Sequence, residues 1–418
     1  MRPAEIAAYE ERYPLLDGET ALQIILAHTP VLASETVPLA AAAGRVLATD
    51  LQAPLSLPPF PQAVVDGYAV IAADPSPRRR LLAEVPAGHP GAVTVTPGTA
   101  VRIMTGAPLP PGADAVVMVE HTSEEDGWVV LHRPVRPGDN IHPVGLDVQA
   151  GETVLRRGTL LGAPEIGLLA TLGITQVPVY RQPVVAVLST GDELVPAEAP
   201  LRPGAIRDSN QPALLVAVRE AGGLPLALGI ARDRAAEQEA LIRQGLERAD
   251  VVLTSGGVSV GGRDFIKPIL ERLGRVHFGR VAIKPGKPLT FATVGDRLVF
   301  GLPGNPVSSL VTFEVFVRPA LRRLQGFRHL HRPEVMVYLE HPVQPSRDRL
   351  EFQRAVVRWH GDRFLARTTG LQASSRLLSL VGANALLKIT AGPAVLPAGS
   401  AVPALLLGPV ETFAAEPR

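Results

Sequence analysis

Four short segments of the sequence combine residues that suit the binding of phosphate-like anions. They are STGDEL (residues 189–194), SGGVSVGGRD (255–264), KPGKP (284–288) and GLPGNPVSS (301–309). Glycines such as Gly256 and Gly257 let backbone N–H groups approach an anion closely. A helix that begins at Pro306 would add free N–H donors and a positive dipole end. Lys284 and Lys287, two of the four lysines in the chain, add positive charge.

Carboxylates stand in or near the same segments. Asp192 and Glu193 are adjacent in STGDEL, Asp264 closes the glycine-rich segment, and Asp208 lies in RDSN. Such oxygen ligands suit Mg²⁺, and a hard cation beside an anion cradle indicates chemistry on a phosphate or pyrophosphate. Asp192 and Glu193 could equally begin a helix. The glycine-rich segment could be an ordinary turn, because it matches neither the P-loop nor the dinucleotide-binding pattern.

The elements around these segments alternate between short apolar strands and amphipathic helices. We expect strands at 184–188, 224–230, 250–254, 276–283 and 298–302, and helices at 212–221, 234–248, 265–273 and 306–324. Continuous apolar strands separated by helices predict a doubly wound α/β domain whose parallel sheet is covered on both faces. Ligands bind at the carboxyl edge of such a sheet, so parallel strands would bring the four segments together. No helix separates residues 283 and 298, so that pair need not be parallel.

The rest of the chain reads mainly as short strands, with helices expected at 17–30 and 164–172. The tail predicts a small β-barrel or sandwich, and Asp66–Gly67 favours a hairpin turn. We predict a split elongated domain of residues 1–47 and 146–179, an inserted β domain of 48–145, the α/β domain of 180–327 and the tail domain of 328–418.

The composition excludes several classes of protein. In 418 residues, 41 basic and 40 acidic side chains give a net charge of +1, and only 4% of residues are aromatic; both values argue against a nucleic-acid partner. Cysteine is absent, so disulfides, thiolate metal sites and a cysteine nucleophile are excluded. We expect no secretory signal and no membrane span, and therefore a cytoplasmic protein.

Seven segments, read in order, resemble the molybdopterin molybdenumtransferases, the MoeA family to which a domain of gephyrin belongs. The segments are PPFPQAVVDGYAV, RIMTGAPLPPGADAVV, GDNIHPVGLDVQAG, STGDEL, SGGVSVGGRDF, IKPGKP and GLPGNPVSS. The resemblance implies the four-domain plan above, with a β-barrel as the last domain, and a homodimer. It also implies that molybdate is inserted into adenylylated molybdopterin and AMP is released, with Mg²⁺ assisting. A molybdopterin adenylyltransferase and recipient molybdoenzymes could act as partners.

The resemblance assigns roles to individual residues. On the β domain, Asp66 and Thr105 would face a cleft of the second subunit, with Asp147 on the same side. The implied catalytic residues are Asp66, Glu193, Asp208, Asp264 and Lys284, and the implied metal ligands are Asp192, Glu193 and Asp264. The implied binding residues are Thr105, Asp147, Gly256, Gly257, Ser259, Lys287, Pro303, Pro306, Arg354 and Ser374. Of these, Arg354 and Ser374 would line the molybdate pocket with the two lysines.

The sequence departs from the family pattern in places, and other functions stay open. Pro61 stands where an aspartate is common, and His142, Pro143 and Val144 replace arginines, which puts an anion contact from that loop in doubt. The alternatives are a molybdopterin adenylyltransferase, a tungstate-selective paralogue and a non-catalytic scaffold.

Overall fold

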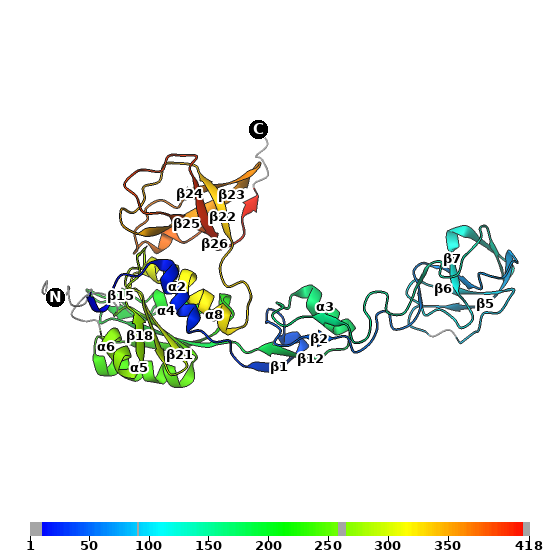
Figure 1. The fold of residues 1–418 in the computed structure, drawn as a ribbon, viewed down its shortest axis with the longest axis horizontal. Helices are drawn as coiled ribbons and strands as arrows, with labels where there is room; N and C mark the ends of the chain where they lie inside the picture. The colour runs from blue at the N-terminus through cyan, green and yellow to red at the C-terminus, as the bar shows by residue number, and fades with distance from the viewer. Residues whose placement is uncertain (1–10, 90–91, 258–264, 413–418) are drawn as a thin grey trace. The chain divides into compact units, whose positions relative to one another are not determined.

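The structure, a computed structural model, describes residues 11–89, 92–257 and 265–412, which fall into two compact units (Figure 1). Unit 1 comprises Met1–Glu35, Gly44–Ala48 and Pro178–Arg418, and unit 2 comprises Thr36–Ala43 and Thr49–Val177. None of the helices in the described ranges is long and apolar enough to span a membrane. The boundaries of the four predicted domains stay predictions.

Unit 1 contains a sheet of six strands in the order β16-β13-β17-β21-β20-β18. Their bounds are Leu224–Ala231 (β16), Val184–Thr190 (β13), Val251–Ser255 (β17), Arg297–Leu302 (β21), Thr290–Val294 (β20) and Arg275–Phe278 (β18). The first four are parallel, and β20 runs antiparallel to both of its neighbours. β18 therefore points the same way as the parallel strands, and its carboxyl end lies at the same edge of the sheet.

Helices cover both faces of this sheet, which confirms the doubly wound α/β class. α5 (Ala235–Arg248) and α6 (Ile266–Leu273) pack on one face, against side chains such as Ala186 and Leu188. The other face packs against α4 (Asn210–Glu220), α7 (Pro306–Thr312) and α8 (Arg318–Leu324). A π-helical turn, Phe313–Val317, joins α7 to α8. α2 (Gly18–Ala27) packs into the same core, and Asp17 caps it by accepting the Thr20 N–H at 2.9 Å.

A β-barrel follows the α/β domain, as predicted. Its strands are β22 (Glu334–Leu339), β23 (Leu350–His360), β24 (Arg363–Thr368), β25 (Ala385–Ile389) and β26 (Ala401–Leu406). They close in the order β23-β24-β22-β26-β25-β23, and β27 (Glu411–Thr412) pairs with β23.

The prediction of one strand over residues 276–283 is wrong. β18 ends at Phe278, and β19 (Ile283–Lys284) pairs in parallel with β23 of the barrel. The KPGKP segment therefore begins inside a strand that bridges the α/β domain to the barrel.

Unit 2 is built mainly from short strands. Its largest sheet has the order β7-β4-β6-β5-β9-β8, formed by Ala115–Met118, Gly67–Val70, Thr99–Ile103, Arg78–Val85, Trp128–Leu131 and Thr122–Glu125 respectively. Two-stranded sheets join β3 (Gln62–Ala63) to β10 (Ile141–His142) and β2 (Leu51–Gln52) to β11 (Thr153–Leu155), and α3 spans Ala163–Thr171. β1 (Ser34–Pro38) pairs with β12 (Gln176–Tyr180), and in unit 1 β14 (Leu194–Val195) pairs with β15 (Ile206–Arg207).

The favoured hairpin at Asp66–Gly67 is not observed. β3 pairs with β10, whereas β4 pairs with β6 and β7. Asp66 therefore stands in a bend between two different sheets.

Candidate functional site

The glycine-rich loop at the carboxyl edge of the α/β sheet packs closely against the ends of the neighbouring strands. Gly256 and Gly257 have φ values of +94° and +67°, a region that side-chain-bearing residues rarely adopt. A Cβ on Gly256 would lie 2.7 Å from the carbonyl oxygen of Thr190, and the Gly256 N–H donates to Leu302 O at 3.1 Å. The loop after β17 is thus pressed between the ends of β13 and β21. Ser259 and Asp264 lie outside the described residues.

One asparagine joins three parts of this edge. Asn210, at the start of α4, donates from Nδ2 to Ser255 Oγ and to Gly304 O, both at 2.7 Å. These bonds tie α4 to the end of β17 and to the loop before α7. Sequence reasoning missed Asn210, although its position directly after Asp208 and Ser209, at the start of a helix, was a usable signal.

The predicted carboxylates occupy different environments. Asp208 is buried, and its Oδ1 accepts the N–H groups of Asn210 and Gln211 at 3.0 and 3.2 Å, so it stabilises the start of α4. Asp192 and Glu193 are exposed, and Asp192 Oδ1 accepts the Asp233 N–H at 3.1 Å. Across the described ranges, the structure brings no three acidic or histidine side chains into a metal-binding group.

The KPGKP turn presents its two lysines differently. Lys284 Nζ lies 3.0 Å from Glu351 Oε1, and 43% of the lysine side chain remains exposed. Lys287 is exposed. Gly286, at φ +117°, packs so closely on α7 that a Cβ would lie 2.4 Å from Thr312 Cγ2. The turn is therefore held from one side by α7 and from the other by the barrel strand β23.

Arg354 is fully buried in β23 and holds the loop between β24 and β25, called here the serine-containing loop because it includes Ser374 and Ser379. Its Nε donates to Ser379 Oγ at 3.1 Å and its Nη2 to Ala373 O at 3.3 Å. Burial lowers the pKa of Arg354 to about 10, although the charge of Glu351 acts in the opposite direction. Arg354 therefore stays charged at neutral pH.

Ser374 connects that loop to the α/β domain. Its Oγ accepts from Asn305 Nδ2 at 3.2 Å, and its carbonyl accepts the Val307 N–H at 3.1 Å. Pro303 is buried just before this contact, and Pro306 opens α7. The structure thus gathers the loop before α7, Ser374, Arg354 and the Lys284–Glu351 pair around β23.

A second cluster of predicted residues lies on unit 2. Asp66 Oδ1 accepts both the N–H and the hydroxyl of Thr105, each at 2.7 Å. The backbone bond from Thr105, then its hydroxyl and the nearby Arg102 charge, lower the pKa of Asp66, so Asp66 is ionised at neutral pH. Asp147 is exposed, and its N–H donates to Leu57 O at 2.9 Å.

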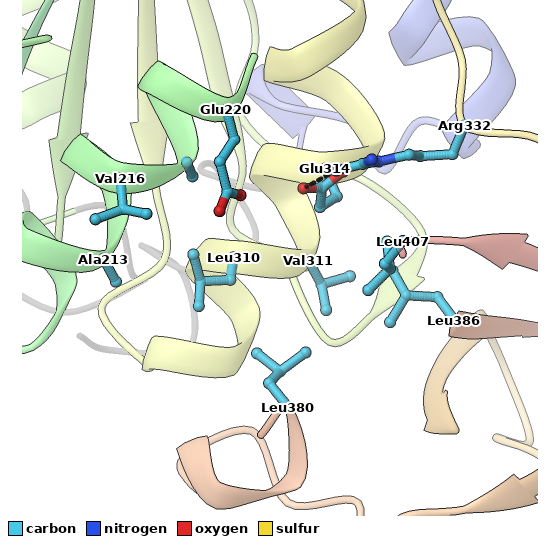
Figure 2. Close-up of a pocket in the computed structure, with 11 residues that line it drawn as sticks. Ala213, Val216, Glu220, Leu310, Val311, Glu314, Arg332, Leu380, Leu386 and Leu407 are labelled. Atoms are coloured by element: carbon cyan, nitrogen blue, oxygen red, sulfur yellow. Dashed lines mark hydrogen bonds and ion pairs between the residues drawn. The ribbon is translucent and has the colours of Figure 1, made fainter. Parts of the chain in front are cut away.

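A cavity of about 410 Å³ lies near the serine-containing loop in unit 1 (Figure 2). Figure 2 shows Val216 of α4, Leu310 and Val311 of α7 and Leu380 turned into it, with Glu314 paired to Arg332 at its upper edge. Such apolar walls solvate a dianion poorly. None of the predicted site residues that the structure describes lines this cavity, so it is distinct from the predicted anion-binding residues Lys284, Lys287, Arg354 and Ser374.

Three family descriptions match successive parts of the chain. Residues 16–173 match the MoeA N-terminal region (domain I and II), residues 186–323 a probable molybdopterin binding domain, and residues 337–407 the MoeA C-terminal region (domain IV). Fold and matches together define a multidomain protein built around a molybdopterin-binding domain.

Comparison with individual similar proteins identifies the family within this class. Molybdopterin molybdenumtransferase 2 of Mycobacterium tuberculosis is 40% identical over 85% of this chain and 90% of its own length. Gephyrin of Dictyostelium discoideum is 37% identical over 95% of this chain, which spans 63% of that longer protein. A solved MoeA structure from Pyrococcus horikoshii has a TM-score of 0.82 at 34% identity and covers 94% of this chain and 100% of its own. The chain belongs to the MoeA family of molybdopterin molybdenumtransferases.

Proposed function

We propose that this chain is a transferase of molybdenum cofactor biosynthesis that inserts molybdate into adenylylated molybdopterin and releases AMP. The observation that carries the proposal is the meeting of two sheets at β19 and β23. That pairing places Lys284 of the α/β domain beside the barrel strand that contains Arg354. The names of relatives that match most of the chain support the same reaction.

The basic groups around β23 suit a tetrahedral dianion. Lys284 and Lys287 are exposed enough to donate to molybdate oxygens, and ammonium groups bind such oxyanions through charge-assisted hydrogen bonds. Ser374 would supply a hydroxyl. The guanidinium of Arg354 is enclosed by protein groups, so it would contribute positive charge and hold the loop that carries Ser374.

Mg²⁺ is proposed as the assisting cation, held by Asp192 and Glu193 with Asp264. These carboxylates suit Mg²⁺ because this ion commonly binds through only one or two protein carboxylates and takes its other ligands from substrate phosphate oxygens. Asp192 and Glu193 are adjacent, exposed and at the carboxyl edge of the sheet. When bound, the ion would neutralise charge at the phosphoanhydride. Asp208 and the glycines at 256 and 257 would shape this edge.

We propose further that the enzyme is a homodimer in which unit 2 contributes Asp66, Thr105 and Asp147 to the other subunit's site. Exposed apolar side chains close to Asp66 support this: Val64, two residues before it, is 36% exposed, and Val119, whose N–H donates to Asp66 O, is 41% exposed. Sedimentation at micromolar concentration should give twice the chain mass of 44.2 kDa. A cytoplasmic location and the partner enzymes stay predictions.

The test of the reaction is AMP release from adenylylated molybdopterin with Mg²⁺, in the presence and absence of molybdate. We expect release that depends on molybdate and at least a hundredfold loss in Glu193→Gln and Lys284→Ala. The urea midpoint should be unchanged in Glu193→Gln, whereas Lys284→Ala should lower it, because it leaves the buried carboxylate of Glu351 without its partner. Formation of adenylylated molybdopterin from ATP would instead identify an adenylyltransferase. Tight pterin binding without AMP release would contradict the proposed reaction and favour a scaffold.

A further inference from the structure

Glu351 is a buried carboxylate that no predicted role uses. It is 1% exposed and lies on β23, directly opposite Lys284 in the register of β19. Its Oε1 is 3.0 Å from Lys284 Nζ, whereas its Oε2 has no hydrogen-bond partner among the described residues. A buried carboxylate oxygen without a hydrogen-bond partner is costly, so the position of Glu351 calls for an explanation.

The surroundings of Glu351 give that explanation. Lys284 is partly exposed, so its ammonium can contact Glu351 and a ligand from solvent at the same time. Arg354, three residues along the same strand, is close enough for Glu351 to stabilise its charge. The positive charges of Lys284 and Arg354 therefore share the single negative charge of Glu351, and the three side chains together carry a net charge of +1.

We propose that Glu351 is a positioning residue that holds Lys284 at the oxyanion site and weakens the binding of dianions there. This inference rests on the proposed function, because it takes Lys284 as an oxyanion ligand. The carboxylate orients the flexible lysine before the ligand arrives. Once a dianion contacts Lys284, the fixed negative charge behind the ammonium repels it, because water and salt screen a buried charge much less than an exposed one. The site therefore binds the oxyanion through an oriented lysine, but with an affinity low enough for the oxyanion to leave again.

The proposal is tested by direct binding, which does not depend on turnover. Calorimetric titration of the full chain with molybdate would compare the wild type with Glu351→Gln. The glutamine keeps an oxygen for Lys284 and removes the charge, so we expect Kd for molybdate to fall at least tenfold. Perrhenate, a tetrahedral monoanion, should gain only about threefold, because Coulomb energy scales with the charge of the ligand. A purely structural role would not separate the two anions.

Two matched variants separate the charge of Glu351 from its other effects. Glu334→Gln removes the same charge from another lysine pair of the barrel, with Lys388 at 2.6 Å, and should leave both Kd values unchanged. Glu351→Asp keeps the charge, so its Kd for molybdate should stay within about threefold of the wild type; a tenfold gain would overturn the proposal even if Glu351→Gln failed to fold. Unchanged or weaker binding in a folded Glu351→Gln overturns it and leaves the proposed function intact. No binding by the wild type overturns both.

Discussion

At the scale of single residues, the pairing of Asp66 with Thr105 shows how two sequence motifs become one feature. The two residues are 39 positions apart and meet through both Thr105 donors. The resemblance predicted each residue but not the contact. A local pattern cannot reveal a contact that depends on where β4 and β6 bring their ends. Glu351 was missed for the same reason, since its significance lies in the partners that the fold supplies.

We predict that Asp66→Asn lowers molybdate-dependent AMP release at least tenfold, because the amide removes the negative charge that the Thr105 contacts maintain at neutral pH. The amide oxygen can still accept from Thr105, so far-UV circular dichroism and the urea midpoint should not change. Thr105→Val, which keeps the backbone N–H donor, should lose less activity. Equal activity of Asp66→Asn and wild type would exclude a charged role for Asp66.

At the scale of elements, prediction succeeded where a strand or helix carried its own pattern. The four parallel strands of the α/β sheet were expected because each is a short, continuous apolar run next to an amphipathic helix. β20 was missed because it lies in a stretch without a clear helical neighbour. β5 was missed because arginines dominate its first half. The sequence could not reveal the split between β18 and β19 either, because β19 forms by pairing with β23, a barrel strand about 70 residues later in the chain.

The close packing of the KPGKP turn on α7 predicts that Gly286→Ala destabilises the protein. Gly286 has a positive φ, and the nearby Thr312 is fixed by hydrogen bonds from its hydroxyl to Ser308 O and Ser309 O. Because Thr312 cannot turn away, the added methyl should cost about 2–3 kcal/mol of unfolding free energy and weaken molybdate binding. Urea denaturation measures the cost.

The control is Gly295→Ala. Gly295 also has a positive φ, +55°, but a Cβ there meets nothing within 4 Å. Gly295→Ala should therefore lower the free energy of unfolding only by the strain of a positive φ in a residue with a side chain, about 1 kcal/mol. Similar costs for the two substitutions would show that the turn does not press on α7.

At the scale of the whole molecule, distant parts of the sequence share one core. α2 near the N-terminus and Phe352 and Leu386 of the barrel belong to the same apolar cluster as one face of the α/β sheet. The ring of His28, which follows α2, lies 3.9 Å from that of His277 on β18, and His277 stacks on Phe291. Burial, aided by the charges of His28 and Arg275, lowers the pKa of His277 to about 4.

This shift predicts a loss of stability in mild acid. The unfolded chain binds a proton near pH 6.5 and the folded chain only near pH 4, so the free energy of unfolding decreases as the pH falls between those values. His277→Phe keeps the ring and removes the titration. From pH 7.5 to 5, the wild type should lose about 1–2 kcal/mol more than this variant in urea denaturation, allowing for partial exposure. Parallel profiles for wild type and His277→Phe would refute the assignment.

The apolar cavity of Figure 2 offers a route to chemical control of the enzyme. Leu380 lines it, and the preceding residue, Ser379, accepts the hydrogen bond from Arg354. A small hydrophobic compound bound there would contact Leu380, which belongs to the same loop as Ser374, without resembling a pterin or an oxyanion. Inhibitor screening against this family can therefore look beyond charged substrate mimics, towards neutral molecules that act one loop away from the chemistry.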